Sequence, residues 1–143
     1  MLKIGQNAPE FSLPNQDDVT ISLKDFKGKK ILIWFFTKAS TGGCTREGLG
    51  FNDYFQSFKK RNISIIGISK DSINAQKNFC NKNEFKFDIL SDTELNVLKN
   101  YKAWGLKKMY GREYEGIYRI TYVIDEDGTI INSYSKLSSW YKN

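Results

Sequence analysis

The sequence contains no histidine and only two cysteines among its 143 residues. Without histidine, the chain lacks the commonest general base and the commonest metal ligand of proteins. The two cysteines, Cys44 and Cys80, are 36 positions apart, a separation that is not typical of zinc sites. We therefore expect no metal site, and any chemistry must depend on cysteine, carboxylates, arginine or hydroxyl groups.

Long apolar runs are absent too. No stretch approaches the roughly 18 apolar residues that a membrane span needs. The N-terminal segment, MLKIGQNAPEF, has neither the apolar core nor the small-residue cleavage site of a signal peptide. These absences favour a cytoplasmic protein without a membrane partner, and in the cytoplasm two cysteines seldom form a purely structural disulfide.

The charge of the chain is positive but dispersed. The formal net charge is +6, from 22 basic and 16 acidic side chains that are interspersed along the sequence. No nucleic-acid-binding motif accompanies the basic residues, so we interpret them as solvated surface and expect no nucleic-acid partner. A chain of this length with 40% hydrophobic residues fits a single folded domain over residues 1–143.

The most informative stretch of the sequence is Ile31–Thr45. Ile31–Phe36 is a run of six apolar residues, which is typical of a strand covered on both faces. The small and polar residues of Thr37–Gly43 interrupt this pattern, and helical spacing follows in Phe51, Tyr54, Phe55 and Phe58. The pattern predicts that Cys44 lies in the first turn of a helix.

A cysteine at a helix start favours the thiolate, because the free N–H groups and the dipole there stabilise negative charge. A thiol with the ordinary pKa near 8.5 is only about 3% ionised at pH 7, and lowering that pKa by ~2 units requires roughly 2.7 kcal/mol. A helix terminus supplies about 0.3–1 kcal/mol of it, so a reactive cysteine would need a further donor or cation. The alternative is that Cys44 is a small apolar core residue.

The remaining pattern predicts a series of short elements. In chain order they are a hairpin over Phe11–Leu23, a strand at Ile63–Ile68, a helix capped by Asp71 or Ser72 that runs to Asn83, a short strand at Phe87–Leu90, a helix capped by Ser91 or Asp92 that contains Leu95, Leu98 and Tyr101, an irregular loop over Lys102–Glu115, strands at Tyr118–Ile124 and Thr129–Tyr134, and a weakly patterned tail over Ser135–Asn143.

This order combines a parallel βαβ start with an antiparallel finish. It predicts an α/β protein with a thioredoxin-like fold, in which helices flank a mixed central β-sheet and a β-hairpin extends the N-terminus. A thioredoxin would carry Cys-x-x-Cys at the helix start, whereas Cys44 has no neighbouring cysteine.

Several segments of the chain resemble one known family. They are IGQNAPEFSLPNQDD, FFTKASTGGCTREGLGF, IIGISKDS and the longer block YKAWGLKKMYGREYEGIYRITYVIDEDG, and the match covers about residues 2–134. The chain resembles a peroxiredoxin of the bacterioferritin comigratory protein (PrxQ) subfamily, in the AhpC/TSA family. The resemblance implies a thioredoxin-dependent thiol peroxidase without a bound cofactor, which reduces hydrogen peroxide and organic hydroperoxides through a cysteine sulfenic acid.

The resemblance also implies which residues react. The family's peroxidatic cysteine falls on Cys44, its active-site arginine on Arg119, and a carboxylate that often follows the cysteine on Glu47. A guanidinium favours the thiolate and polarises the O–O bond with fixed donors, and Glu47 could orient it. Apart from this resemblance, the alternative for Arg119 is a surface ion pair on a strand, and the alternative for Glu47 is the partner in a capping box.

The loop before Cys44 both matches and departs from the family pattern Pro-x-x-x-Thr-x-x-Cys. Its threonine is Thr41, which we expect to hydrogen-bond the peroxide unless it only caps the helix, and the N–H groups of Gly43 and Cys44 are expected to bind the same region of the substrate. The proline position is Thr37, and Gly42 stands where the subfamily often has proline. We expect these two departures to loosen the loop rather than to concern reacting atoms.

The second cysteine is expected to resolve the sulfenic acid. Many relatives carry a resolving cysteine five residues after the first, where this chain has Leu49, and others place it on the following helix, where Cys80 lies. A Cys44–Cys80 disulfide would require the helix start to unwind, because bridged Cα atoms are ~4.4–6.8 Å apart. Thioredoxin or a similar dithiol would reduce it. The alternative for Cys80 is a core thiol in a one-cysteine enzyme.

For the protein as a whole we expect a monomer. The alternative function is a catalytically weak thioredoxin-fold redox sensor or partner-binding module.

Overall fold

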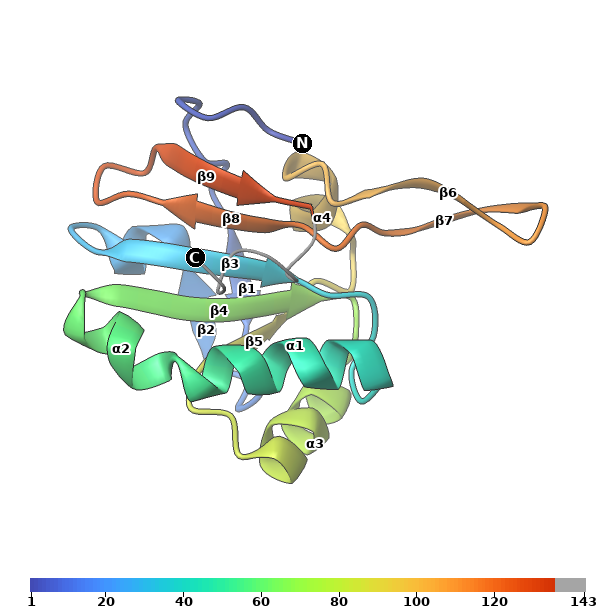
Figure 1. The fold of residues 1–143 in the computed structure, drawn as a ribbon, viewed down its shortest axis with the longest axis horizontal. Helices are drawn as coiled ribbons and strands as arrows, with labels where there is room; N and C mark the ends of the chain where they lie inside the picture. The colour runs from blue at the N-terminus through green and yellow to red at the C-terminus, as the bar shows by residue number, and fades with distance from the viewer. Residues whose placement is uncertain (136–143) are drawn as a thin grey trace.

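A computed structural model describes residues 1–135, in which a five-stranded sheet forms the centre of the molecule (Figure 1). The strand order is β5-β4-β3-β8-β9. The strands are β3 (Lys30–Phe35), β4 (Ile63–Ser69), β5 (Asp88–Ser91), β8 (Thr121–Ile124) and β9 (Ile130–Tyr134). Neighbours are parallel from β3 to β5 and antiparallel from β3 to β9. This arrangement confirms the mixed central sheet predicted from the order of the elements.

The apolar run of β3 is buried on both faces, as a central strand requires. Successive side chains of a strand point to opposite faces, so Leu32 and Trp34 enter one apolar cluster while Ile31, Ile33 and Phe35 enter the other. The first cluster lies beneath helices α1 (Gly42–Asp53) and α3 (Ile73–Asn83), and the second beneath the short α4 (Asn96–Asn100) and the N-terminal segment.

The N-terminal hairpin is present as β1 (Ser12–Pro14) and β2 (Thr20–Ser22), followed by the 3₁₀-helix η1 (Leu23–Phe26). The Gln16 side chain connects this hairpin to the edge strand β5 through two hydrogen bonds. Its Nε2 donates to Asp88 Oδ1 at 2.9 Å, and its Oε1 accepts from the Ile89 N–H at 3.0 Å. The hairpin confirms the predicted N-terminal β-hairpin extension.

Two of the predicted helices differ in their bounds. The helix after Cys44 breaks at Tyr54 into α1 and α2 (Phe55–Lys60), so the apolar spacing across that residue does not belong to one continuous helix. The helix predicted from Ser91 or Asp92 begins only at Asn96, because Leu95 adopts a left-handed conformation with φ of 69°. Asp92 still bonds this helix, accepting from the Leu98 N–H at 2.7 Å.

The prediction of an irregular loop over Lys102–Glu115 was wrong. This segment forms an antiparallel hairpin, β6 (Trp104–Met109) and β7 (Arg112–Ile117), which projects from the sheet (Figure 1). Its strands are mostly exposed, so no alternation of apolar residues marks them. Its turn residues Tyr110 and Gly111 both have positive φ, and tyrosine is not among the residues typical of that turn.

None of the helices within residues 1–135 is long and apolar enough to cross a membrane. The predicted weak tail, from residue 136 onward, lies outside the described residues.

Candidate active site

Cys44 lies in the first turn of α1 and is fully buried. The first helical residue is Gly42, and the Thr45 N–H bonds to the Thr41 carbonyl at 2.9 Å. The N–H groups of Gly43 and Cys44 therefore precede the helical hydrogen-bond ladder, and their partial positive charge lies next to the sulfur.

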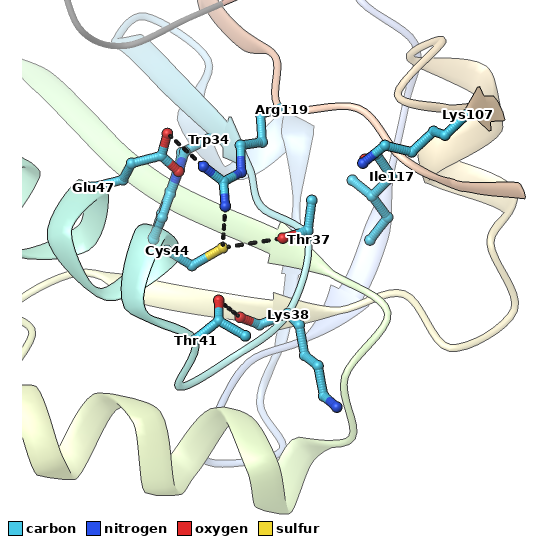
Figure 2. A network of polar contacts seen from close by, with 9 residues as sticks. All are labelled: Trp34, Thr37, Lys38, Thr41, Cys44, Glu47, Lys107, Ile117 and Arg119. Carbon is cyan, nitrogen blue, oxygen red and sulfur yellow. Dashed lines mark hydrogen bonds and ion pairs between the residues drawn. The ribbon is translucent and has the colours of Figure 1, made fainter. Parts of the chain in front are cut away.

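Arg119 extends toward this sulfur from the segment between β7 and β8 (Figure 2). Its Nη2 atom is 3.9 Å from Cys44 Sγ. The base of the projecting hairpin holds this segment in place, since Lys107 Nζ donates to the Ile117 carbonyl at 3.1 Å and the Tyr118 N–H donates to the Ala103 carbonyl at 2.7 Å. The structure thus brings Arg119 to Cys44 across 75 positions of sequence.

Glu47 lies one turn after Cys44 and faces the same guanidinium, with Oε2 at 4.0 Å from Arg119 Nη1. Its other oxygen accepts a hydrogen bond from Trp34 Nε1 at 3.2 Å. Burial raises the pKa of the Glu47 carboxyl, while the Arg119 charge and the Trp34 hydrogen bond act in the opposite direction. Glu47 bonds no backbone N–H at the helix start among these contacts, so its place fits orientation of Arg119 better than a capping box.

Thr41 occupies the N-cap position of α1 by its backbone, but its side chain makes no capping hydrogen bond. The hydroxyl instead donates to the Lys38 carbonyl at 2.8 Å (Figure 2). The structure therefore places Thr41 beside the site without directing its hydroxyl to the sulfur.

Thr37 contacts the sulfur, which the sequence analysis did not foresee. Its Oγ1 lies 3.3 Å from Cys44 Sγ. The expectation that residue 37 affects only the freedom of the loop misses this contact. A threonine directly after the apolar run Ile31–Phe36 and seven residues before the cysteine was the available signal, but the direction of its side chain depends on the folded loop.

Gly43 lies so close to Arg119 that no side chain fits between them. A Cβ atom added to Gly43 would be 2.7 Å from Arg119 Nη2 and 3.0 Å from Nη1. Real Cβ atoms do not approach so closely, so the guanidinium would have to move. The glycine therefore has a steric role in addition to the expected N–H contact with substrate.

We expect Gly43→Ala to slow peroxide reduction by about 10- to 100-fold, the effect of losing a hydrogen bond to a charged group. Because the displaced atoms are the flexible end of Arg119, the melting temperature should change little. Stopped-flow peroxide reduction and a thermal melt measure the two quantities. Gly42→Ala is the matched control, since nothing lies within 4 Å of its added Cβ. Parent-like activity of Gly43→Ala would contradict the steric role.

Asp71 anchors the loop that precedes Cys44. Its Oδ2 accepts from the Ala39 N–H at 2.9 Å and from the Ser69 hydroxyl at 2.6 Å. The helix cap at this point is Ser72, whose hydroxyl accepts from the Ala75 N–H at 3.1 Å. The sequence offered Asp71 only as an alternative cap, because its partner N–H lies 32 positions away and no local pattern reveals it.

Cys80 lies on α3 in the same apolar cluster as Cys44, and both cysteines are free thiols. Burial, together with the nearby charges of Asp88 and Asp17, raises the pKa of the Cys80 thiol to about 12. At pH 7 the Cys80 thiol is therefore protonated in this conformation. Cys80 can attack another sulfur only after its surroundings open.

Comparisons with known proteins agree with this fold. The AhpC/TSA family matches residues 4–133. A putative peroxiredoxin Bcp of Haemophilus influenzae is 41% identical over 94% of this chain and 87% of its own length, and peroxiredoxin Bcp of Escherichia coli is 40% identical over 90% and 83%. Among solved structures, peroxiredoxin Q of Xanthomonas campestris covers 87% of this chain and 78% of its own, with 32% identity and a TM-score of 0.83.

Two further structures of the Xanthomonas campestris protein carry serine in place of one or the other of two cysteines, which are 36 positions apart in that protein. Cys44 and Cys80 have the same separation.

The fold, the cysteine at the start of α1 and the similar proteins together identify the class of this protein. It is a thioredoxin-fold thiol peroxidase, that is, a peroxiredoxin. The chain belongs to the AhpC/TSA family, and its relatives in it are the Bcp and PrxQ peroxiredoxins.

Proposed function

We propose that this protein reduces hydrogen peroxide and organic hydroperoxides with Cys44 as the attacking nucleophile. The observation that supports the assignment is the Arg119 guanidinium 3.9 Å from a buried sulfur at the start of α1. A helix terminus alone stabilises a thiolate too weakly, and the guanidinium supplies the additional positive charge that a reactive cysteine needs. A structure of the Xanthomonas campestris bacterioferritin comigratory protein concerns its alkyl peroxide reduction activity, which supports including organic hydroperoxides.

In the proposed reaction, the Cys44 thiolate attacks one peroxide oxygen and a sulfur–oxygen bond forms. The O–O bond breaks, its electron pair stays with the other oxygen, and a proton converts that oxygen to water or an alcohol. Cys44 is left as a sulfenic acid. Negative charge develops on the leaving oxygen, where the Arg119 N–H groups are fixed donors that need no rearrangement.

The loop residues have lesser proposed roles. The Gly43 N–H, which lies before the helical ladder, is available to a peroxide oxygen. The Thr41 hydroxyl already donates to the Lys38 carbonyl, so it can take part as an acceptor for the peroxide O–H. Glu47 positions Arg119 through their ion pair and the Trp34 hydrogen bond.

For the second half of the cycle we propose Cys80 as the resolving thiol. Its thiolate would attack the sulfenic sulfur, so that a sulfur–sulfur bond forms and the sulfur–oxygen bond breaks, and the hydroxyl would leave as water with the proton that the Cys80 thiol had released. A thioredoxin-type dithiol would then return both cysteines to thiols by exchange and become oxidised itself. The matching separation of the two substituted cysteines in the Xanthomonas campestris protein supports this pairing. Since Cys80 is buried and protonated, resolution must follow local opening of α1 or α3.

We expect one equivalent of hydrogen peroxide to decrease the mass of the reduced protein by two hydrogens, with the bridge mapped to Cys44 and Cys80. Before peroxide is added, iodoacetamide should modify Cys44 rapidly and Cys80 slowly, because the Cys80 thiol stays protonated whereas the Arg119 guanidinium favours the thiolate of Cys44. Intact-mass and peptide mass spectrometry measure both. Sulfenic or sulfinic acid on Cys44 with a free Cys80 would contradict the resolving role.

Turnover separates the peroxidase from the alternative of a weak redox sensor or binding module. A peroxidase consumes many equivalents of peroxide with thioredoxin, thioredoxin reductase and NADPH, whereas a sensor is oxidised once and stops. Consumption limited to one equivalent would contradict the proposed function.

We further propose that the chain acts as one domain, as a monomer and in the cytoplasm. Two free cysteines that must return to thiols suit a reducing compartment. Sedimentation of the reduced protein at the mass of two chains would contradict the monomer.

A further inference from the structure

Thr37 lies two residues after the end of β3 and turns its side chain toward Cys44 (Figure 2). Its Oγ1 is 3.3 Å from Cys44 Sγ, closer to the sulfur than the Arg119 Nη2 at 3.9 Å. We propose that Thr37 is a further catalytic residue, whose hydroxyl donates a hydrogen bond to the Cys44 thiolate. This inference rests on the proposed function, in which Cys44 is the nucleophile.

The direction of this hydrogen bond follows from the ionisation state of the sulfur. A hydroxyl carries one donor and two acceptor lone pairs, so it can pair with a thiol in either direction. A thiolate has no proton, and the bond can then run only from Oγ1 to Sγ. Hydrogen bonds to an ionised partner are roughly twice as strong as neutral ones, so the contact favours the thiolate over the thiol.

The other threonines near Cys44 direct their hydroxyls elsewhere. Thr41 donates to the Lys38 carbonyl at 2.8 Å, and Thr45 donates to the Thr41 carbonyl at 2.7 Å. Of these three threonines, Thr37 alone places its hydroxyl on the sulfur. The Arg119 side chain is 43% exposed and its charge is partly screened by solvent, which leaves a role for a second donor to the sulfur.

Residue 37 is also where the family pattern has proline, whose side chain has no hydrogen-bond donor. Threonine at this position adds a donor to the sulfur that proline cannot supply. The substitution therefore bears on the reacting atom and not only on the loop.

The test compares Thr37→Val, which keeps the shape and removes the hydroxyl, with Thr37→Ser, which keeps the hydroxyl. The rate of Cys44 alkylation by iodoacetamide is measured across pH by mass spectrometry of the Cys44 peptide, and peroxide reduction by stopped flow. We expect Thr37→Val to slow alkylation at pH 7 by about tenfold and to displace its pH profile upward, with a comparable loss in peroxide reduction. Thr37→Ser should have the same alkylation profile and the same rate of peroxide reduction as the parent.

Thr45→Val is the matched control, because it removes the hydroxyl of a neighbouring threonine that bonds a carbonyl and not the sulfur. Its alkylation profile should coincide with that of the parent. The inference is overturned if Thr37→Val leaves the profile unchanged, if Thr37→Ser is displaced as far as Thr37→Val, or if Thr45→Val has the same effect. Alkylation requires no peroxide, so a parent protein that fails to reduce peroxide overturns the proposed function separately.

Discussion

Replacing Cys44 with serine is expected to lower the rate of peroxide reduction by on the order of 10⁴-fold or more, the scale of losing a nucleophile. A serine hydroxyl at neutral pH is neither ionised nor comparably nucleophilic, so no other part of the site can compensate. The measurement is the second-order rate constant for hydrogen peroxide at pH 7.

The same variant should fold normally. Serine is smaller than the buried cysteine and can keep a hydrogen bond to Thr37, so the free energy of unfolding should change by about 1–2 kcal/mol at most. Leu49→Ser, on the exposed side of α1, is the matched control and should keep parent-like activity. If Cys44→Ser still reduces peroxide within tenfold of the parent, Cys44 is a core residue and another group performs the chemistry.

The sequence could predict the parts of the fold that depend on local periodicity and burial. The run Ile31–Phe36 indicated a central strand because burial on both faces requires apolar residues at consecutive positions. The N-terminal hairpin and the strand–helix–strand order followed in the same way. The hairpin β6–β7 was missed because its strands are exposed, so burial imposes no pattern on them.

In the candidate site, too, local features could be predicted from the sequence and contacts that depend on the folded backbone could not. A cysteine at a helix start is a local feature, and its position was predictable from the end of one pattern and the start of the next. The loop contacts were not, because the Thr37 and Thr41 hydroxyls each have several partners within reach and the folded backbone selects among them. Asp71 and its bond to Ala39 connect two loops that only the parallel pairing of β3 and β4 brings together.

The second large effect is expected at Arg119. Arg119→Met should slow peroxide reduction by about 10²- to 10³-fold, the usual result of removing a fixed donor from a site of developing negative charge. Arg119→Lys keeps the positive charge without the planar pair of donors, so its rate should fall between those of the parent and Arg119→Met. If Arg119 were only a surface ion pair, both variants would reduce peroxide at the parent rate.

A thermodynamic measurement tests the Arg119–Glu47 pair independently of activity. Burial already raises the pKa of Glu47, and the Arg119 charge opposes this increase, so Arg119→Met should raise that pKa further. A carboxyl whose pKa is higher in the folded state binds more protons there, and stability falls as the pH rises through the range between its unfolded and folded pKa values. Chemical denaturation should therefore show a larger loss of stability for Arg119→Met, relative to the parent, at pH 7 than at pH 4.

The control repeats the substitution without the carboxylate. Relative to Glu47→Gln alone, Glu47→Gln combined with Arg119→Met should lose the same stability at both pH values, since the amide does not titrate. For Arg119→Met alone, an equal loss at both pH values would mean that the carboxylate does not depend on the guanidinium, and Glu47 could not be what positions it.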